Sequence, residues 1–526
     1  MDKIIAWDLG TGGNKASLYD REGNCLASTF VPYDTAYPNS GWHEQRPDDW
    51  WRAVVESTRR VLDQTRVDPR QIGCCGISGH SLGAVPLDRE GRLLRPLTPI
   101  WSDGRAAAQA REFFGRCDEL EWYRITGNGF SPHLYSVFKV MWYRDHEPGM
   151  FSRIDKIIGT KDYVNFRLTS RIYTDPSYAS GSGVYDLLRW GYSDRLIEAS
   201  GLPASIFPEI VPSSQVIGQL THEAADALGL HTGVKVVAGG VDNSCMALGA
   251  KAFKEGRVYN NLGSSCWIAV CSAKPLIRDA SRPYVFSHVL PGMFASALCI
   301  VAGGSSFRWI QEQLAPDLAA RAERERVDVY DLMAEEASRS PLGARGLLFN
   351  PSLGGGMPMD KSADTRGGFL GLDLGHTRAD LFRAAMEGIT LGLRLCLDEL
   401  RRLTQVSDEM LIVGGGSKNT LWRRIYADGY GMRVVKSNVD QQAAALGAAA
   451  VAAVGTGLWK DFDRIDAIHR TEEVVEPDTA NAAAYQRLLG PFKKAADDLA
   501  DLQTLLRSNG GGKGREAPLA GEIVAA

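Results

Sequence analysis

The chain has 526 residues, of which 44% are apolar and 23% charged, as expected for a soluble protein with more than one domain. Its formal net charge of −4 gives no broad attraction to nucleic acid or to anionic membranes, and no apolar run approaches the ~20 residues of a membrane span. The chain enters a strand without a signal peptide, and its nine cysteines show no disulfide or zinc-binding pattern, so we expect a cytoplasmic protein.

A glycine-rich turn, residues 8–15, joins the first two predicted strands, residues 4–7 and 16–19. In a P-loop or a dinucleotide fold such glycines would lead into a helix instead. Glycines in this turn would let backbone N–H groups approach an anion, Thr11 and Lys15 would add donors, and Asp8 would hold a metal ion directly or through water. An ordinary hairpin with a glycine-rich turn explains the same residues, and this stretch alone does not decide between the two.

Strands and helices alternate through the rest of the first half. A proline and two acids open a helix over residues 47–64, and a short apolar strand over 71–78 ends in a Gly-His-Ser-Leu-Gly segment, residues 79–83. Residues 100–105 end another strand, and their Asp103 and Arg105 lie where α/β sheets place ligands, although a surface ion pair is the plainer interpretation. Residues 175–185, rich in serine and glycine, predict an ordered loop over a cleft.

The second half begins by repeating the first. The segment Asn261-Leu262-Gly263-Ser264 matches Asp8-Leu9-Gly10-Thr11, and in both copies a Leu-Gly-hydroxyl turn lies between two strands. Two related α/β domains that face each other would grip a polyphosphate between these turns. A third glycine turn, in residues 411–419, precedes a helix whose N-terminus would receive a phosphate or a nucleoside. Residues 380–403 and 443–453 predict two further helices.

Five motifs together resemble the FGGY carbohydrate kinases, a family of the sugar kinase/actin/Hsp70 superfamily, and xylulose kinases in particular. The similarity extends from residue 3 to about residue 455. The motifs are Trp42-His43-Glu44-Gln45, Trp101-Ser102-Asp103-Gly104-Arg105, Lys161-Asp162-Tyr163, Gly239-Gly240-Val241-Asp242-Asn243 and Val413-Gly414-Gly415-Gly416-Ser417. No single motif is decisive, but all five occur in the family's order.

This resemblance implies an α/β fold of two ribonuclease-H-like domains around a central cleft. We expect an N-terminal sugar-binding domain at residues 1–250, a C-terminal nucleotide-binding domain at residues 251–506, and a disordered tail at residues 507–526. The family's partners are a small sugar or polyol and ATP, with Mg²⁺ as the metal. No nucleic acid or membrane partner is expected, and a homodimer stays open.

The resemblance also implies the roles of individual residues. Asp242 is the catalytic general base, and the sequence agrees, because a carboxylate between a strand and a helix can point into the cleft. The substrate would be bound by His80, Ser81, Leu82, Asp103, Asp242 and Asn243. ATP would be bound by Gly10, Thr11, Gly12, Gly13, Lys15, Gly263, Ser264, Ser265, Gly303, Gly304, Gly414, Gly415, Gly416 and Asn419. Asp8 and Asp242 would hold Mg²⁺, mostly through water.

One departure from the family pattern affects substrate choice. Xylulose kinases carry a Gln-Met-His-Gly run at the sugar pocket, whereas this chain reads His80-Ser81-Leu82-Gly83 and places a leucine at the histidine position. Three hypotheses remain. The first, from the matching motifs, is a kinase of a ketose, with a pentulose favoured. The second is a kinase of a polyol, tetrulose, deoxyketose or quorum-signal derivative. The third is an actin- or Hsp70-like ATPase, against which the sugar-site motifs argue.

Overall fold

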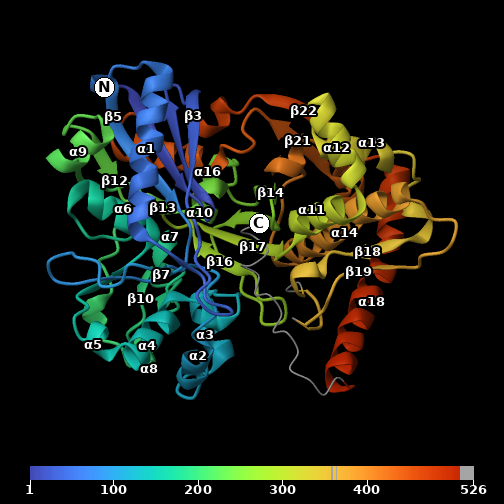
Figure 1. Cartoon of the computed structure of the whole chain (residues 1–526), viewed down its shortest axis with the longest axis horizontal. Coiled ribbons are helices and arrows are strands. Elements are labelled where there is room, and N and C mark those ends of the chain that lie inside the picture. The colour runs from blue at the N-terminus through green and yellow to red at the C-terminus, as the bar shows by residue number, and fades with distance from the viewer. Residues whose placement is uncertain (357–358, 363, 510–526) are drawn as a thin grey trace.

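Two mixed β-sheets, one from each half of the chain, form the framework of the computed structural model (Figure 1). The structure describes residues 1–356, 359–362 and 364–509. Figure 1 shows the N-terminal half on one side, the C-terminal half on the other, and α10 and α16 between them. None of the helices in these described ranges is long and apolar enough to cross a membrane.

The N-terminal sheet is built on β1, which pairs antiparallel with β2 and parallel with β5. Its strands, in spatial order, are β11 (Val216–Gln219), β12 (Lys235–Val237), β5 (Ile72–Gly79), β1 (Lys3–Leu9), β2 (Gly13–Tyr19) and β3 (Cys25–Pro32), with β13 (Gly240–Val241) also on β5. Helices cover both faces of the sheet, so consecutive β1 residues such as Ile4 and Ile5 are both buried, in different hydrophobic clusters.

The C-terminal sheet repeats this arrangement around β14, which pairs antiparallel with β15 and parallel with β20. Its strands, in spatial order, are β16 (Tyr284–Ser287), β17 (Phe294–Ile300), β15 (Cys266–Ser272), β14 (Val258–Leu262), β20 (Glu409–Val413), β21 (Arg433–Ser437) and β22 (Thr471–Val475). Both glycine turns of the predicted repeat thus join antiparallel strands that hold equivalent places in their sheets. The predicted strand–turn–strand repeat is confirmed.

Among the described residues, the remaining strands form four small two-stranded pairs. They are β4 (Glu44–Gln45) with β7 (Thr98–Pro99), β6 (Val85–Leu87) with β8 (Lys156–Ile158), β9 (Tyr185–Asp186) with β10 (Gly191–Tyr192), and β18 (Leu348–Asn350) with β19 (Gly368–Leu370).

The α-helices of the first half are α1 (Pro47–Thr65), α2 (Ala107–Phe114), α3 (Glu119–Thr126), α4 (Ser136–His146), α5 (Pro148–Phe151), α6 (Thr160–Thr169), α7 (Pro176–Ala179), α8 (Asp194–Ser200), α9 (His222–Leu228) and α10 (Asp242–Gly249). Those of the second half are α11 (Gly303–Leu314), α12 (Pro316–Glu325), α13 (Val329–Ala337), α14 (Arg378–Leu403), α15 (Thr420–Tyr430), α16 (Ala443–Gly455), α17 (Arg464–Ile468) and α18 (Thr479–Asn509).

Most helix expectations are confirmed to within three residues. Helix α1 begins at Pro47, with Asp48 and Asp49 in its first turn, and ends before Arg66, which adopts a left-handed conformation. Helices α14 and α16 match the predicted segments 380–403 and 443–453. Helix α18 continues to Asn509, and the rest of the predicted tail, residues 510–526, lies outside the described residues.

Helices α10 and α16 cross at close range and form one hydrophobic cluster with strands of both sheets. Helix α16 belongs to the C-terminal half but packs on β1 and β5 of the N-terminal sheet. Glycines permit this crossing: a Cβ on Gly447 would lie 1.9 Å from the Cys245 carbonyl oxygen, and one on Gly249 would lie 1.8 Å from that of Ala443. The halves therefore share a core around the helix that begins with Asp242.

Candidate active site

Two cavities contain most of the predicted site residues. The first, here the interdomain cavity, encloses about 250 Å³ and takes its lining from both halves. It is lined by Thr11, Ser81, Leu82, Trp101, Phe130, Leu134, Asp242, Asn243, Ser265, Trp267, Tyr284, Phe286, Ala297, Cys299 and Val301. The second, here the C-terminal pocket, encloses about 390 Å³. It is lined by Leu262, Gly263, Ser264, Cys266, Gly304, Phe307, Arg308, Asp328, Tyr330, Asp331, Met386, Gly415, Gly416, Lys418, Asn419, Trp422, Tyr426 and Gln441.

Asp242 is the first residue of α10 and follows β13 directly. Its Oδ1 accepts hydrogen bonds from the backbone N–H of Asn243 at 2.7 Å and from Asn243 Nδ2 at 3.1 Å. Burial raises the pKa of the Asp242 carboxyl to about 7, and the nearby charge of Asp8 acts in the same direction, against the lowering effect of these hydrogen bonds. A carboxylate with a pKa near neutrality suits a general base.

A buried polar network supports the backbone just before Asp242. The Val241 N–H donates to Ser177 Oγ at 2.9 Å, and Ser177 Oγ donates to Asp175 Oδ2 at 2.5 Å. Asp175 forms an ion pair with Lys161 Nζ at 3.0 Å, and Lys161 also donates to the Ala238 carbonyl at 3.1 Å. The Lys161-Asp162-Tyr163 motif and the predicted serine-rich loop therefore fix the entry into α10.

Leu82 lines the interdomain cavity in a conformation that is unusual for leucine. Its φ of 58° lies in the left-handed region, and its side chain is buried. Lys139 Nζ donates to the Leu82 carbonyl at 2.9 Å and to the Ile100 carbonyl at 2.6 Å. Burial lowers the pKa of Lys139 to about 7, partly offset by Asp103. Two backbone hydrogen bonds from a buried lysine thus hold the strained turn that presents Leu82.

His80 and Asp103 do not line either cavity. The His80 ring packs edge-on against Trp50, burial lowers its pKa to about 3, and its nitrogens have no hydrogen-bond partner of normal geometry among the described residues. The Asp103 carboxylate is buried in an ion pair with Arg105 at 2.7 Å and accepts the His43 N–H at 2.7 Å. The Asp103–Arg105 pair is therefore not on the surface, and its position leaves direct substrate binding by Asp103 without structural support.

The remaining predicted residues lie in or beside the glycine turns. Gly10 and Gly12 lie in the β1–β2 turn, Gly13 begins β2, and Thr11 of the same turn lines the interdomain cavity. Lys15 Nζ donates to the Gln441 carbonyl at 2.7 Å, which links this sheet to the C-terminal pocket. Asp8 accepts a hydrogen bond from Ser78 Oγ at 3.2 Å, and burial raises its pKa, while the charge of Lys15 lowers it. Gly303 and Gly414 adjoin lining residues of the C-terminal pocket.

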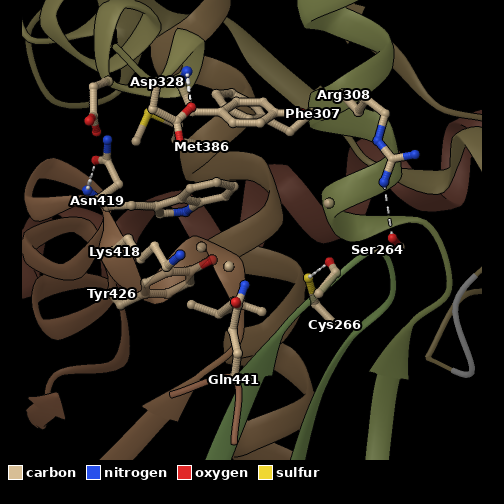
Figure 2. A pocket seen from close by; sticks show the side chains of 18 residues that line it. Ser264, Cys266, Phe307, Arg308, Asp328, Met386, Lys418, Asn419, Tyr426 and Gln441 are labelled. Carbon is tan, nitrogen blue, oxygen red and sulfur yellow. Dashed lines mark hydrogen bonds between the residues drawn. The ribbon is translucent and has the colours of Figure 1, made fainter. Parts of the chain in front are cut away.

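The C-terminal pocket unites the second and third glycine turns with the N-terminus of α11 (Figure 2). Arg308 donates to Ser264 Oγ at 3.2 Å, and the Ser305 N–H donates to the Ser264 carbonyl at 3.0 Å. A Cβ on Gly304 would lie 2.2 Å from the Gly263 carbonyl oxygen, so this position has no room for a side chain. The N-terminus of a 12-residue helix beside a glycine turn is suited to phosphate.

Sequence inspection missed the aromatic and charged walls of this pocket. Figure 2 shows the rings of Phe307 and Tyr426 there, with Met386 and Arg308 nearby. Residues 419, 422 and 426 follow helical spacing from the predicted Asn419, a signal that would have found Trp422 and Tyr426. The missed lining residues are Leu262, Cys266, Phe307, Arg308, Asp328, Tyr330, Asp331, Met386, Lys418, Trp422, Tyr426 and Gln441.

Nearly the whole chain is similar to known carbohydrate kinases. The N-terminal domain model of the FGGY family of carbohydrate kinases matches residues 3–249, and the C-terminal domain model matches residues 258–456. A xylulose kinase of Bacillus subtilis is 30% identical over 512 residues, which cover 97% of this chain and 99% of the relative. The crystal structure of xylulose kinase from Rhodospirillum rubrum is 30% identical, with a TM-score of 0.86 over 95% of this chain and all of that one.

Relatives with other names are nearly as similar. The autoinducer-2 kinase of Yersinia enterocolitica is 27% identical over 92% of each chain. The structure of gluconate kinase from Lactobacillus acidophilus is 25% identical, with a TM-score of 0.85 over 97% of this chain and 99% of that one. These relatives are all named kinases, but their names give different compounds. The chain therefore belongs to the FGGY family of carbohydrate kinases, as an ATP-dependent sugar kinase.

Proposed function

We propose that this kinase phosphorylates a ketose, with a pentulose favoured, and that Asp242 is its general base. The observation that carries the proposal is the place of Asp242 on the interdomain cavity, with a carboxyl pKa of about 7. Such a group is partly deprotonated at neutral pH and still basic enough to take a proton from a hydroxyl. Xylulose kinases among the similar proteins support a pentulose as the first substrate to test.

In the proposed reaction, the sugar occupies the interdomain cavity and ATP occupies the C-terminal pocket. Asp242 accepts the proton of the attacking hydroxyl, and Asn243 fixes the carboxylate by its two hydrogen bonds. The turn at Gly263 and Ser264 and the N-terminus of α11 hold the phosphates. Phosphoryl transfer depends mainly on positioning and on stabilisation of charge, which these fixed backbone groups provide.

The two neighbouring carboxylates are suited to Mg²⁺. Burial raises the pKa values of both Asp8 and Asp242, and the charge of Asp8 further raises that of Asp242, so a cation would relieve an existing repulsion. Mg²⁺ prefers one or two carboxylates together with water and phosphate oxygens. We propose that these residues hold it, and the ion would neutralise charge on the phosphates when bound.

A different polyhydroxy substrate is the second candidate, and Leu82 favours it. The leucine replaces a hydrogen-bonding ring with an apolar wall in the interdomain cavity, which suits a polyol, tetrulose, deoxyketose or quorum-signal derivative. The ATPase hypothesis is not retained, because both domain models and the similar proteins are those of carbohydrate kinases. We also propose a cytosolic location, in keeping with the nine free cysteines, eight of them buried.

ADP release measured with ATP, Mg²⁺ and a panel of acceptors tests the proposal. The panel comprises D-xylulose, other pentuloses, tetruloses, pentitols, deoxyketoses and gluconate. We expect a ketose to reach a kcat/KM of about 10⁴ M⁻¹ s⁻¹ or more, the lower range for natural substrates. If gluconate or a pentitol is phosphorylated more efficiently than every ketose, the ketose assignment is wrong.

A further inference from the structure

The short helix α7 lies behind the interdomain cavity and packs on strands of both halves. Its residues, Pro176–Ala179, do not line the cavity, and they contact β13 of the N-terminal sheet and β16 of the C-terminal sheet. Ser177 and Tyr178 are buried, as is Ser180 just after the helix. Ser180 Oγ accepts the Ser287 N–H of β16 at 3.3 Å, so this segment is tied to the C-terminal sheet.

Ser177 holds the strand that leads into Asp242. Its Oγ accepts the Val241 N–H at 2.9 Å and donates to Asp175 Oδ2 at 2.5 Å. A Cβ on Gly240 would lie 3.2 Å from Ser177 Oγ, so the side chain and the strand are in close contact. Because Val241 directly precedes Asp242, the position of Ser177 determines where the catalytic carboxylate begins.

Tyr178, the next residue, holds the segment that carries Leu82, here called the acceptor turn, residues 80–84. Its hydroxyl accepts the Gly83 N–H at 3.2 Å and the Thr160 N–H at 3.0 Å. A Cβ on Gly159 would lie 2.2 Å from the Tyr178 ring, so the ring fits a space that a side chain there would fill. Two neighbouring residues of α7 therefore support opposite sides of the cavity.

Helix α4 supports the same turn through different groups. Ser136 Oγ, Lys139 Nζ and the Tyr143 hydroxyl donate to the carbonyl groups of residues 82–84 at 3.0, 2.9 and 2.9 Å. Their spacing of three and four residues places them on one face of α4. The carbonyl side of the acceptor turn thus belongs to α4 and an N–H of the turn belongs to α7, which also packs on β13.

We propose that Ser177 and Tyr178 are positioning residues, and that α7 sets the acceptor turn and Asp242 relative to each other as one unit. Neither side chain lines the cavity, so both act through residues that do. Proton transfer and phosphoryl transfer require a fixed distance between the reacting hydroxyl and its base, and a displacement of about 1 Å can cost ~10²-fold in rate. This inference rests on the proposed function and adds residues outside the cavity to it.

Two substitutions that each remove one hydroxyl test the proposal. Tyr178→Phe removes the support of the acceptor turn, and Ser177→Ala removes that of the strand before Asp242. Since one unit holds both, each variant should raise the KM for D-xylulose and also lower kcat, with kcat/KM about tenfold lower. The KM for ATP should stay within about twofold, because α7 does not line the C-terminal pocket. Unchanged constants for D-xylulose, or an equal change in the KM for ATP, would overturn the proposal.

The double variant distinguishes one unit from two separate supports. Once the first substitution has freed α7, the second has less to remove, so kcat/KM should fall about 10- to 20-fold, not the ~100-fold of independent losses. The matched control is Tyr143→Phe, which removes another buried hydroxyl from the acceptor turn, but on α4. Combined with Ser177→Ala, it should give nearly the product of the two single effects. If the two double variants behave alike, α7 is not the unit.

Hydrogen exchange of the wild-type enzyme gives a test that needs no variant. D-xylulose without nucleotide should slow the exchange of backbone N–H groups in the acceptor turn, in residues 175–180 and in residues 239–243 together. Slower exchange confined to the acceptor turn would contradict a shared unit.

Failure of the proposed function is seen in other measurements. If another compound of the panel is the better acceptor, it replaces D-xylulose in all these assays. If Asp242→Asn retains near-normal kcat, the general base is wrong, whereas the double variants still decide whether α7 holds the acceptor turn and the start of α10 together. If Asp242→Asn is inactive and both double variants lose the product of the single effects, the function stands and the inference is wrong.

Discussion

The two glycine turns of the repeat have the same local structure but contribute differently to the two cavities. The N-terminal turn lies between β1 and β2. Its Thr11 lines the interdomain cavity, and an acid, Asp8, precedes its first glycine. The C-terminal turn, between β14 and β15, lines the C-terminal pocket with Gly263 and Ser264 and has Asn261 in place of the acid. The repeat thus supplies one charged turn and one neutral turn.

This difference assigns different tasks to the two copies. The charge of Asp8 raises the pKa of Asp242, and these two carboxylates are the ones proposed to hold Mg²⁺, whereas a carboxylate at residue 261 would repel the phosphates proposed to bind beside it. Ser265 belongs to the C-terminal turn and lines the interdomain cavity, so the two sites meet there. Away from this shared turn, substitutions in one cavity should affect mainly the substrate that is proposed to bind there.

Asp242→Asn should have the largest effect, confined to the chemical step on the interdomain side. Loss of a general base typically lowers kcat by ~10²–10⁴. Because Asp242 does not line the C-terminal pocket, the Kd for ATP without Mg²⁺, measured by calorimetry, should stay within about twofold. A folded variant with near-normal kcat would remove Asp242 from the mechanism.

Gly304→Ala should have the second-largest effect, and this effect should be on the C-terminal pocket. The new Cβ would lie 2.2 Å from the Gly263 carbonyl oxygen, so α11 must move away from the turn. We expect the KM for ATP to rise about 10- to 100-fold, as for small displacements of positioned groups, with little change in acceptor binding. Gly490→Ala is the control, since a Cβ there meets nothing within 4 Å. Equal effects of the two substitutions would contradict the assignment of the pocket.

The pH dependence of kcat/KM for the acceptor should report the raised pKa of Asp242. The carboxylate must be deprotonated to accept a proton, and bound Mg²⁺ would lower its pKa from the metal-free value of about 7, so the rate should level off at or below about pH 7 and fall at lower pH, by about tenfold per unit well below the pKa. Asp8→Asn removes a negative charge that raises this pKa, so the profile should move to lower pH. A profile that stays flat down to pH 5 would exclude this role.

Leu82→His should have the smallest effect, a change in preference between acceptors. Histidine tolerates the left-handed conformation of this residue better than leucine does, and the hydrogen bonds from Lys139 go to backbone oxygens and persist. We expect kcat/KM for D-xylulose to gain about tenfold relative to 1-deoxy-D-xylulose, about 1.4 kcal/mol of transition-state preference. Leu82→Met, which keeps the wall apolar, should leave the ratio unchanged; a shift of the same size would implicate shape instead.

The sequence predicted the framework of the fold because its signals are local. Glycine turns between apolar strands, the capped start of α1 and the small residues of α16 each determine their own segment. The same signals placed Asp242 and Asn243 at the end of a strand, and the structure finds both on the interdomain cavity; they also marked the glycine turns that line the C-terminal pocket.

Residues whose position depends on long-range packing were harder to predict. Asp103 has a motif position typical of a sugar ligand, yet Arg105 forms buried ion pairs with both Asp103 and Glu44, and Asp103 does not line the interdomain cavity. The apolar wall of the interdomain cavity includes Phe130 and residues of three strands, β15 to β17, and no sequence period connects them. Such surfaces follow from sheet register and domain contact, which local patterns do not encode.

The crossing of α10 and α16 has a consequence for dissecting the enzyme. Because α16 covers β1 and β5, a fragment that ends after residue 250 would expose that face of its sheet to solvent. The complementary fragment would carry the alanine-rich α16 without the sheet on which it packs. Neither half is a free-standing binding module. Co-expressed fragments of a chain divided in the segment 253–257 should instead reassemble through this helix pair. The kinase is therefore a candidate for complementation assays in which enzymatic activity reports the association of two polypeptides.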